Sequence, residues 1–234
     1  LSSICNVFIK IIGIQPQQVF KNIYNSTELL YLIMQSLHFP AVFQLAAKLI
    51  LCGDYAISFG WLLLKTLLDE HGLGRKLPAK VSKLPVFNSN SSVASNKLYR
   101  EQRIRAIELL ILLFNQQSLN TSELFDAASN ALPLLLQDSG DDRERSVVFR
   151  VGFILGPSAA LSYSAVSIVN SLLCSDELLV AALQYITRFS VILGPRSIEL
   201  FAYRVLHRKT VNNFVMLCAA SMIAKCVKLQ KGNA

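Results

Sequence analysis

The sequence predicts an all-α protein built from stacked antiparallel helical hairpins. The first observation is an apolar run closed by Gly-Pro that occurs twice, at residues 150–157 and 188–195. The copies lie 38 residues apart and share the pattern Arg-x-x-x-Ile-Leu-Gly-Pro. The second observation is that about eleven segments have helical hydrophobic spacing, whereas no useful length of chain alternates like a strand. A helix boundary that recurs at this spacing is typical of stacked helix pairs.

The Gly-Pro pair predicts the end of one helix and the start of the next. Glycine tolerates the left-handed backbone that closes a helix, and proline suits the first turn of the following helix. Downstream of each break the register persists weakly, because Ala181-Ala182 in one copy matches Ala219-Ala220 in the next.

In the N-terminal block, hydrophobic spacing, prolines and capping residues set the predicted helix boundaries. Asn25 followed by Glu28 is a capping-box pattern, and Asp54 is a second candidate cap. The helix after Asp54 is apolar all round, which predicts a centrally buried helix. The helices predicted in this block span residues 2–13, 16–24, 25–37, 40–51 and 54–69.

Residues 71–96 differ in character from the rest of the chain. They are rich in Gly, Pro, Asn and Ser and lack helical period. A loop of this length is uncommon inside a compact domain, so a flexible basic linker is predicted here. The predicted organisation is therefore an N-terminal helical block at 1–70, a linker at 71–96 and a C-terminal helical-repeat block at 97–234.

In the C-terminal block, Asn120 with Glu123 repeats the cap pattern and Pro133 is a possible kink. Asp141 and Arg145 have the spacing of an i, i+4 ion pair, and Ser175 is a predicted cap. The predicted helices span residues 97–115, 120–137, 143–155, 158–173, 176–193, 196–207 and 210–229.

Helix-pair spacing, small residues at packing positions and Gly-Pro breaks together resemble the armadillo/HEAT class of helical-repeat proteins, mainly over residues 97–230. The resemblance is to the class and not to any one member. It implies an alpha-solenoid that presents an extended surface to a protein partner. The first block departs from a regular period, so an irregular multi-helix bundle is the alternative.

The composition is unusually apolar, with 53% hydrophobic and 16% charged residues. Either the helices are buried on several sides or some of them cross a membrane. The longest charge-free run, residues 151–175, contains Gly156-Pro157 and many serines, which disfavours a spanning helix. No signal peptide is expected in the chain as given. Five scattered cysteines without a Cys-x-x-Cys predict reduced thiols in an intracellular protein, cytoplasmic or nuclear.

No pattern of residues predicts catalysis, and we expect no catalytic residue, cofactor or metal. His38, His71 and His207 have no neighbouring ligand at metal spacing, and neither a Gly-x-Ser-x-Gly elbow nor a phosphate loop is present. Gly152 and Gly156 form a small-residue motif that predicts close helix approach followed by helix termination.

Basic residues gather in two zones, which are the only feature of the sequence that suggests a function. Residues 72–105 carry eight basic side chains and one acidic one, and residues 196–234 carry seven and one. If they share a face, they could bind an acidic protein surface or a phosphate backbone. Partner-binding candidates are Lys97, Arg100, Arg103, Arg105, Arg204, Arg208, Lys209, Lys225 and Lys228.

The sequence therefore predicts a non-enzymatic protein–protein interaction scaffold, a segment of a larger helical-repeat protein. The alternative is a nucleic-acid- or chromosome-associated solenoid that holds phosphates through the basic zones. A multi-pass membrane protein is the third hypothesis. The sequence leaves the oligomeric state open.

Overall fold

The structure is a computed structural model that describes residues 2–51, 56–69, 95–116, 122–171, 174–189, 203, 205–206 and 213–231. Within these ranges the regular secondary structure is all helical, which confirms the all-α class. The packing divides the chain into two compact units, Leu1–Ala131 and Leu132–Ala234. None of the helices described is both long and apolar enough to cross a membrane.

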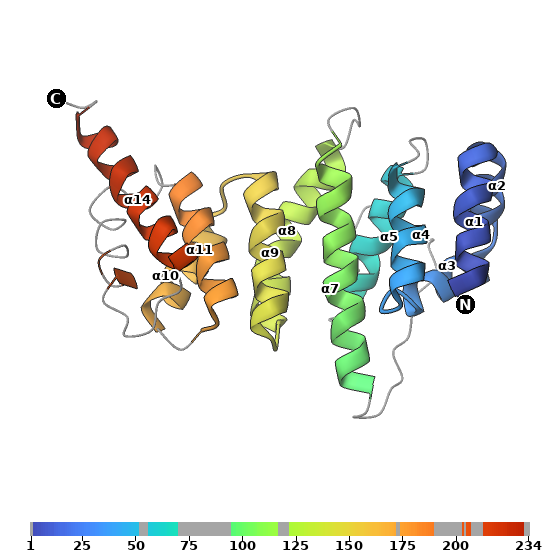
Figure 1. The fold of residues 1–234 in the computed structure, drawn as a ribbon, viewed down its shortest axis with the longest axis horizontal. Coiled ribbons are helices and arrows are strands. Elements are labelled where there is room, and N and C mark those ends of the chain that lie inside the picture. Colours follow the sequence, from blue (N-terminus) through green and yellow to red (C-terminus); the bar gives the residue numbers. More distant parts are fainter. Residues whose placement is uncertain are drawn as a thin grey trace. The chain divides into compact units, whose positions relative to one another are not determined.

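Among its described residues, unit 1 contains six helices and the first part of a seventh (Figure 1). Two of them begin at a proline, as predicted, because proline has no amide hydrogen to lose at a helix start. The bounds are α1 (Ser2–Ile14), α2 (Pro16–Asn25), α3 (Thr27–Gln35), α4 (Pro40–Leu51), α5 (Ala56–Asp69), α7 (Ser95–Phe114) and α8 (Ser122–Asp138).

The cap of α3 differs from the prediction. Ser26, and not Asn25, is the N-cap residue, and its hydroxyl accepts a hydrogen bond from the Leu29 amide at 3.2 Å. The reason is that α2 continues through Asn25, so the first residue with extended backbone is Ser26. The cap predicted at Asn120 and the one at Asp54 lie outside the described residues.

Helix α5 packs against α4 and α7. Most of its apolar side chains are buried, as predicted, although Trp61 is half-buried. Gly60 lets α5 approach its neighbours closely. A Cβ at this position would collide with the Leu113 side chain and would lie 2.6 Å from the Leu124 side chain.

Helix α7 packs against α3, α4 and α5, three of the helices that precede the predicted linker in the chain. Because α7 buries its apolar residues against these helices, it belongs to unit 1, and the division between the two units falls within α8. The predicted linker at residues 71–96 stays a prediction. Of the predicted linker, only residues 95 and 96 are described, and they belong to α7.

Unit 2 is organised around α11, which packs against α9, α10 and α14. The inward face of α11 is apolar and buried, whereas its other face carries charged and polar residues. The bounds are α9 (Asp142–Leu155), α10 (Ala159–Ser171), α11 (Asp176–Arg188) and α14 (Asn213–Lys231), together with the end of α8.

The first Gly-Pro break separates α9 from α10, as predicted. Gly156 has a φ of 122°, a conformation that favours glycine. Pro157 lies before α10 and outside its first turn, because Ser158 occupies the cap and accepts a hydrogen bond from the Leu161 amide at 3.4 Å. The second break, at 194–195, lies outside the described residues.

A buried tyrosine from α11 holds this break in place. The Tyr185 hydroxyl accepts a hydrogen bond from the Ser158 amide at 2.8 Å and lies 3.3 Å from the Gly156 carbonyl oxygen. Gly152 faces the same ring, since a Cβ there would lie 3.2 Å from Tyr185 and 2.9 Å from Leu161. The predicted close approach at Gly152 is confirmed.

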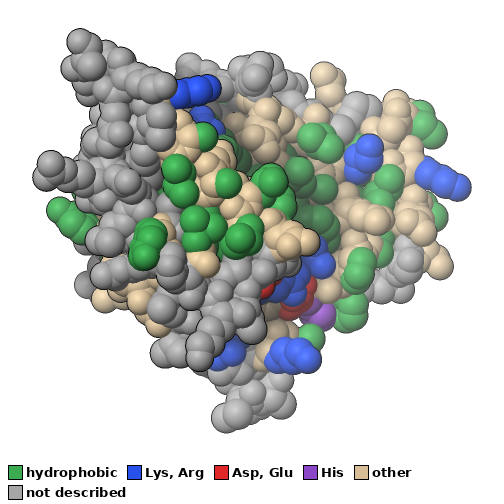
Figure 2. All heavy atoms as spheres, turned by 60° about the vertical axis from the view of Figure 1, so that its left-hand side comes forward, with side chains coloured by type: hydrophobic (Ala, Val, Ile, Leu, Met, Phe, Trp, Pro, Cys, Tyr) green, Lys and Arg blue, Asp and Glu red, His purple; other side chains and the backbone are tan. Residues whose placement is uncertain are grey.

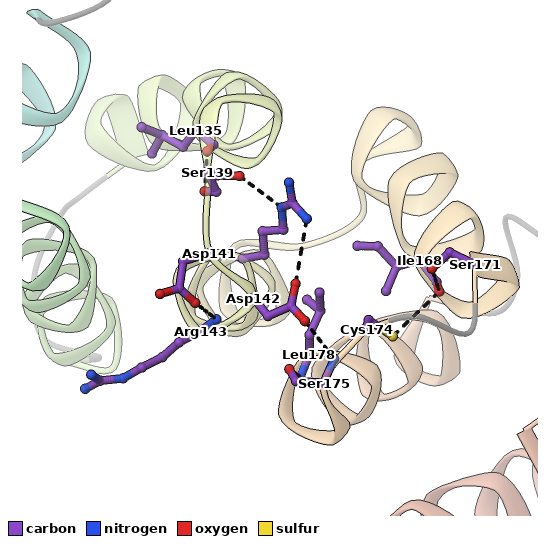
Figure 3. A network of polar contacts seen from close by, with 11 residues as sticks. Leu135, Ser139, Asp141, Asp142, Arg143, Ile168, Ser171, Cys174, Ser175 and Leu178 are labelled. Atoms are coloured by element: carbon purple, nitrogen blue, oxygen red, sulfur yellow. Dashed lines mark hydrogen bonds and ion pairs between the residues drawn. The ribbon is translucent and has the colours of Figure 1, made fainter. Parts of the chain in front are cut away.

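The N-termini of α9 and α11 are joined by side-chain caps (Figure 3). Asp142 accepts a hydrogen bond from the Ser175 amide at 2.6 Å, and the predicted cap at Ser175 is confirmed. Arg145 pairs with Asp142 at 3.7 Å and not with Asp141, because the Asp141 carboxylate caps α9 at the Arg143 amide. Adjacent N-termini mean that α9 and α11 run parallel.

Candidate functional site

A surface groove in unit 2 is lined by α9, α11 and α14. It consists of two adjoining hollows of about 440 and 700 Å³ that share Gln184 and Phe214. We call it the α11 groove. Its lining residues are Ser146, Arg150 and Phe153 from α9, Asp176, Glu177, Val180, Ala181, Gln184, Thr187 and Arg188 from α11, and Phe214, Val215, Leu217, Cys218 and Ser221 from α14.

Helical periodicity places these residues together. The α11 residues recur at three- and four-residue intervals, which is one face of a helix, and the opposite face is buried in the unit. Ser146, Arg150 and Phe153 follow the same spacing on α9. Each helix therefore presents one stripe to the groove.

The groove contains exposed apolar surface at the α14 side. Phe214 is 53% exposed and Leu217 is 68% exposed, although both are large hydrophobic side chains. Figure 2 shows such apolar side chains exposed among polar atoms on one face of the molecule. Phe153 adds an aromatic ring from α9. Exposed apolar residues that converge on a concavity are typical of a binding surface.

Two arginines line the groove without an acidic partner. Arg150 and Arg188 are exposed, and none of the described carboxylates forms an ion pair with either. The Arg188 guanidinium stacks on the Phe153 ring at 4.3 Å from its centroid. A stacked guanidinium keeps its N–H donors in its plane, where they are available to a carboxylate or a phosphate.

The opposite end of the groove is acidic. Asp176 and Glu177 form the first turn of α11, where the helix dipole stabilises negative charge. Glu177 accepts a hydrogen bond from the Ser146 hydroxyl at 3.0 Å. The groove is therefore polarised along α11, with carboxylates at the N-terminal end and Arg188 at the C-terminal end.

The groove offers binding contacts and no evident reactive group. Burial raises the pKa of the Cys218 thiol, which keeps it protonated at neutral pH and makes it a poor nucleophile. Across the described ranges, no three His, Cys, Asp or Glu side chains gather closely enough to hold a metal ion.

The basic residues predicted on α7 divide into two kinds. Lys97 and Arg100 are exposed, as a partner-binding role requires. Arg103 is only 5% exposed, and its guanidinium lies against Tyr99, 3.3 Å from the hydroxyl. Of these three candidates, two therefore face outward, and Arg103 faces the interior of the unit.

Arg105 is neutralised within its own unit. It forms ion pairs with Glu101 at 3.1 Å and Glu108 at 2.8 Å, and its guanidinium lies 4.9 Å from the Phe43 ring centroid. These contacts neutralise the charge that an acidic partner would need.

In the second predicted zone, Lys228 is exposed on α14. Arg204, Arg208 and Lys209 lie outside the described residues, as does the Lys225 side chain. Of the candidates whose side chains the structure describes, none lines the α11 groove; these are Lys97, Arg100, Arg103, Arg105 and Lys228. The signal that could have found the groove is the arginine shared by the two motif copies, which is Arg150 in one and Arg188 in the other.

Comparisons with known proteins do not assign the chain to a family: no protein-family model matches it, and neither a curated protein nor a solved structure does.

Proposed function

We propose that the protein is a non-enzymatic protein–protein interaction scaffold whose partner lies in the α11 groove. The observation that carries the proposal is the groove itself, in which exposed Phe214 and Leu217 lie beside Arg188. This arginine forms no ion pair with a described carboxylate. Apolar anchors combined with arginine are the residue types that contribute most to protein interfaces.

The finer architecture we propose is a stack of helical hairpins similar to armadillo/HEAT repeats. Three facts support it: α9 and α11 run parallel, α10 follows α9 in the chain and packs against α11, and equivalent arginines recur 38 residues apart at the same groove. Repeats of this kind align successive helices so that equivalent residues form an extended surface. A longer protein that continues the repeat would extend that surface.

A nucleic acid is the second candidate partner, because Lys97, Arg100 and Lys228 are exposed. The α11 groove argues against it as the nucleic-acid site. A phosphate backbone carries one negative charge per nucleotide and would meet Asp176 and Glu177 as well as the arginines.

Site-specific photo-cross-linking tests the proposal. A photo-reactive phenylalanine analogue is placed at Leu217 in the groove and, as the control, at Tyr163, which is 74% exposed on α10 in the same unit. After irradiation in source-cell extract we expect a protein adduct from position 217 and none from position 163. The adduct should survive nuclease treatment, and the captured partner should bind the purified chain.

Two outcomes would contradict the scaffold proposal. One is equal cross-linking at both positions, which would indicate non-specific contact. The other is an adduct that disappears with nuclease, which would favour the nucleic-acid alternative.

A further inference from the structure

We propose that the larger hollow of the α11 groove binds a small organic molecule that carries one carboxylate on an apolar body, such as a fatty acid. Phe153, Arg188, Phe214 and Leu217 line this hollow, which we call the Arg188 hollow. The inference goes beyond the proposed scaffold function, because the ligand is a small molecule and needs no docked protein in order to bind.

The Arg188 hollow has the size of a small-molecule site. Its volume is about 700 Å³, and pockets that hold small organic ligands measure about 300–1,000 Å³. Its lining residues come from α9, α11 and α14, and α11 packs against both of the other helices. The walls therefore belong to one packed unit, so the hollow is formed before any partner binds.

The charge of the hollow comes from one residue. Of the described residues that line it, Arg188 alone is charged, and no described carboxylate forms an ion pair with it. Asp176 and Glu177 line the other hollow, and Glu177 precedes Arg188 by eleven residues on the same helix. Eleven residues of α-helix span about 17 Å, roughly twice the Debye length at physiological ionic strength. The acidic end of α11 therefore leaves the positive charge of this hollow largely uncompensated.

Two aromatic rings orient the Arg188 guanidinium. Its central carbon, Cζ, lies 4.3 Å from the Phe153 ring centroid and 5.6 Å from that of Phe189. Contact with a ring face leaves the N–H donors in the guanidinium plane, where a carboxylate accepts two parallel hydrogen bonds. Because the side chain is already held, little of its conformational freedom is lost on binding. One guanidinium balances one negative charge, so a monocarboxylate fits better than a phosphate dianion.

The large apolar side chains of the hollow determine the body of the ligand. Phe214 and Leu217 are exposed, and Phe153 is half-buried. All three line the same hollow as Arg188, so an apolar body that binds there removes their surfaces from water. A ligand that matches both parts of the hollow therefore carries its carboxylate at one end and apolar carbon at the other.

The test titrates the full chain with dansylaminoundecanoic acid, a fluorescent carboxylate whose emission increases in an apolar site. Its methyl ester is the matched ligand without charge. We expect the chain to bind the acid about tenfold more tightly than the ester, because only the acid forms the charge-assisted hydrogen bonds. Arg188→Gln should weaken binding of the acid about tenfold and leave the ester unchanged, so that the preference disappears.

Two further variants check the assignment of the site. Arg143→Gln makes the same charge change at an exposed residue of α9 outside the groove, and this variant should keep the preference for the acid. Leu217→Ser should weaken binding of the acid and the ester alike, about fivefold, because it removes apolar contact from both. Circular dichroism checks that each variant is folded.

Four outcomes overturn the inference: equal binding of the acid and the ester by the wild type, no binding of either ligand, a preference that persists in Arg188→Gln or is equally lost in Arg143→Gln, and no effect of Leu217→Ser. The titration uses the purified chain without a partner, whereas the cross-link at position 217 uses no added ligand. The scaffold proposal fails on the cross-link and this inference fails on the titration, so the two failures are distinguishable.

Discussion

Helix α7 in unit 1 and the helix pair α9 and α11 in unit 2 use arginine in opposite ways. On α7, Arg105 is bound by two glutamates and an aromatic ring, and Arg103 is buried. On α9 and α11, Arg150 and Arg188 are exposed in a groove with no acidic partner among the described residues.

The contrast runs against the distribution of charge along the sequence. Residues 72–105 carry eight basic and one acidic side chain, whereas residues 106–195 carry four basic and nine acidic. The available guanidinium pair nevertheless lies in the acidic stretch. Charge density in the sequence does not predict charge on a face, because neighbours one helical turn away can neutralise a cation.

The largest effect expected in this comparison comes from Gly60→Ala in unit 1. The new Cβ would collide with the side chains of Leu113 and Leu124, so we expect a loss of about 1–3 kcal/mol in the free energy of unfolding. Thermal denaturation measures the loss. Hydrogen exchange followed by mass spectrometry localises it, with faster exchange in α5 and α7.

Exchange in α9 and α11 is the internal control for the Gly60 variant. If these helices exchange faster to the same degree, then the two units do not have separate stabilities, and a comparison between them has no thermodynamic meaning.

Tyr185→Phe is the corresponding substitution in unit 2. We expect it to lower the free energy of unfolding by about 1–2 kcal/mol. The ring remains, but the Ser158 amide loses its 2.8 Å acceptor. Tyr163→Phe, at an exposed ring on α10, should change nothing measurable. A Tyr185 variant as stable as the wild type would mean that water replaces the hydroxyl.

The contrast between the arginines themselves is tested by Arg105→Gln and Arg150→Gln. We expect Arg105→Gln to lower the free energy of unfolding by about 1 kcal/mol, because it removes two partly exposed ion pairs and a contact with Phe43. Arg150→Gln should change the free energy of unfolding by less than about 0.5 kcal/mol, since it breaks no hydrogen bond or ion pair within the described residues.

Chemical denaturation of both arginine variants measures this difference. Equal losses would remove the distinction between a structural and an available arginine.

The smallest expected effect is on the pH dependence of stability and is caused by Tyr185. It is absent at neutral pH and appears only in alkali. Burial raises the pKa of Tyr185 above its ordinary value of 10.0, so the folded state keeps its phenol protonated. This contribution to stability is complete below about pH 10 and is lost as pH rises through the raised pKa. Between pH 9 and 11, stability should therefore fall less steeply in Tyr185→Phe than in the wild type; parallel profiles would contradict this.

Much of the fold follows from local sequence signals. Pro16 and Pro40 begin helices where predicted, Ser175 caps α11, and Gly156 takes the backbone conformation expected of it. These features depend on residues within one helical turn, which the sequence displays directly. The cap at Ser26 was misplaced by one residue because two capping side chains stand side by side and only the end of α2 decides between them.

The groove could not be predicted, because it depends on which helices meet. The pairing of Arg105 with two glutamates was readable at helical spacing, and the burial of Arg103 was not. Arg150 and Arg188 were visible as a repeated pair, but their shared surface requires the packing of α9 on α11.

The Tyr185 hydroxyl also makes a difference between the two segments of the chain that a duplication could copy. A copied module of residues 150–187 would contain both the break at 156–158 and the tyrosine that fastens it. A copied module of residues 188–225 would contain Gly194-Pro195, but 38 residues after Tyr185 it has Ile223, which has no hydroxyl. The two copies of the motif therefore differ in sequence at the position of the tyrosine that binds the first break.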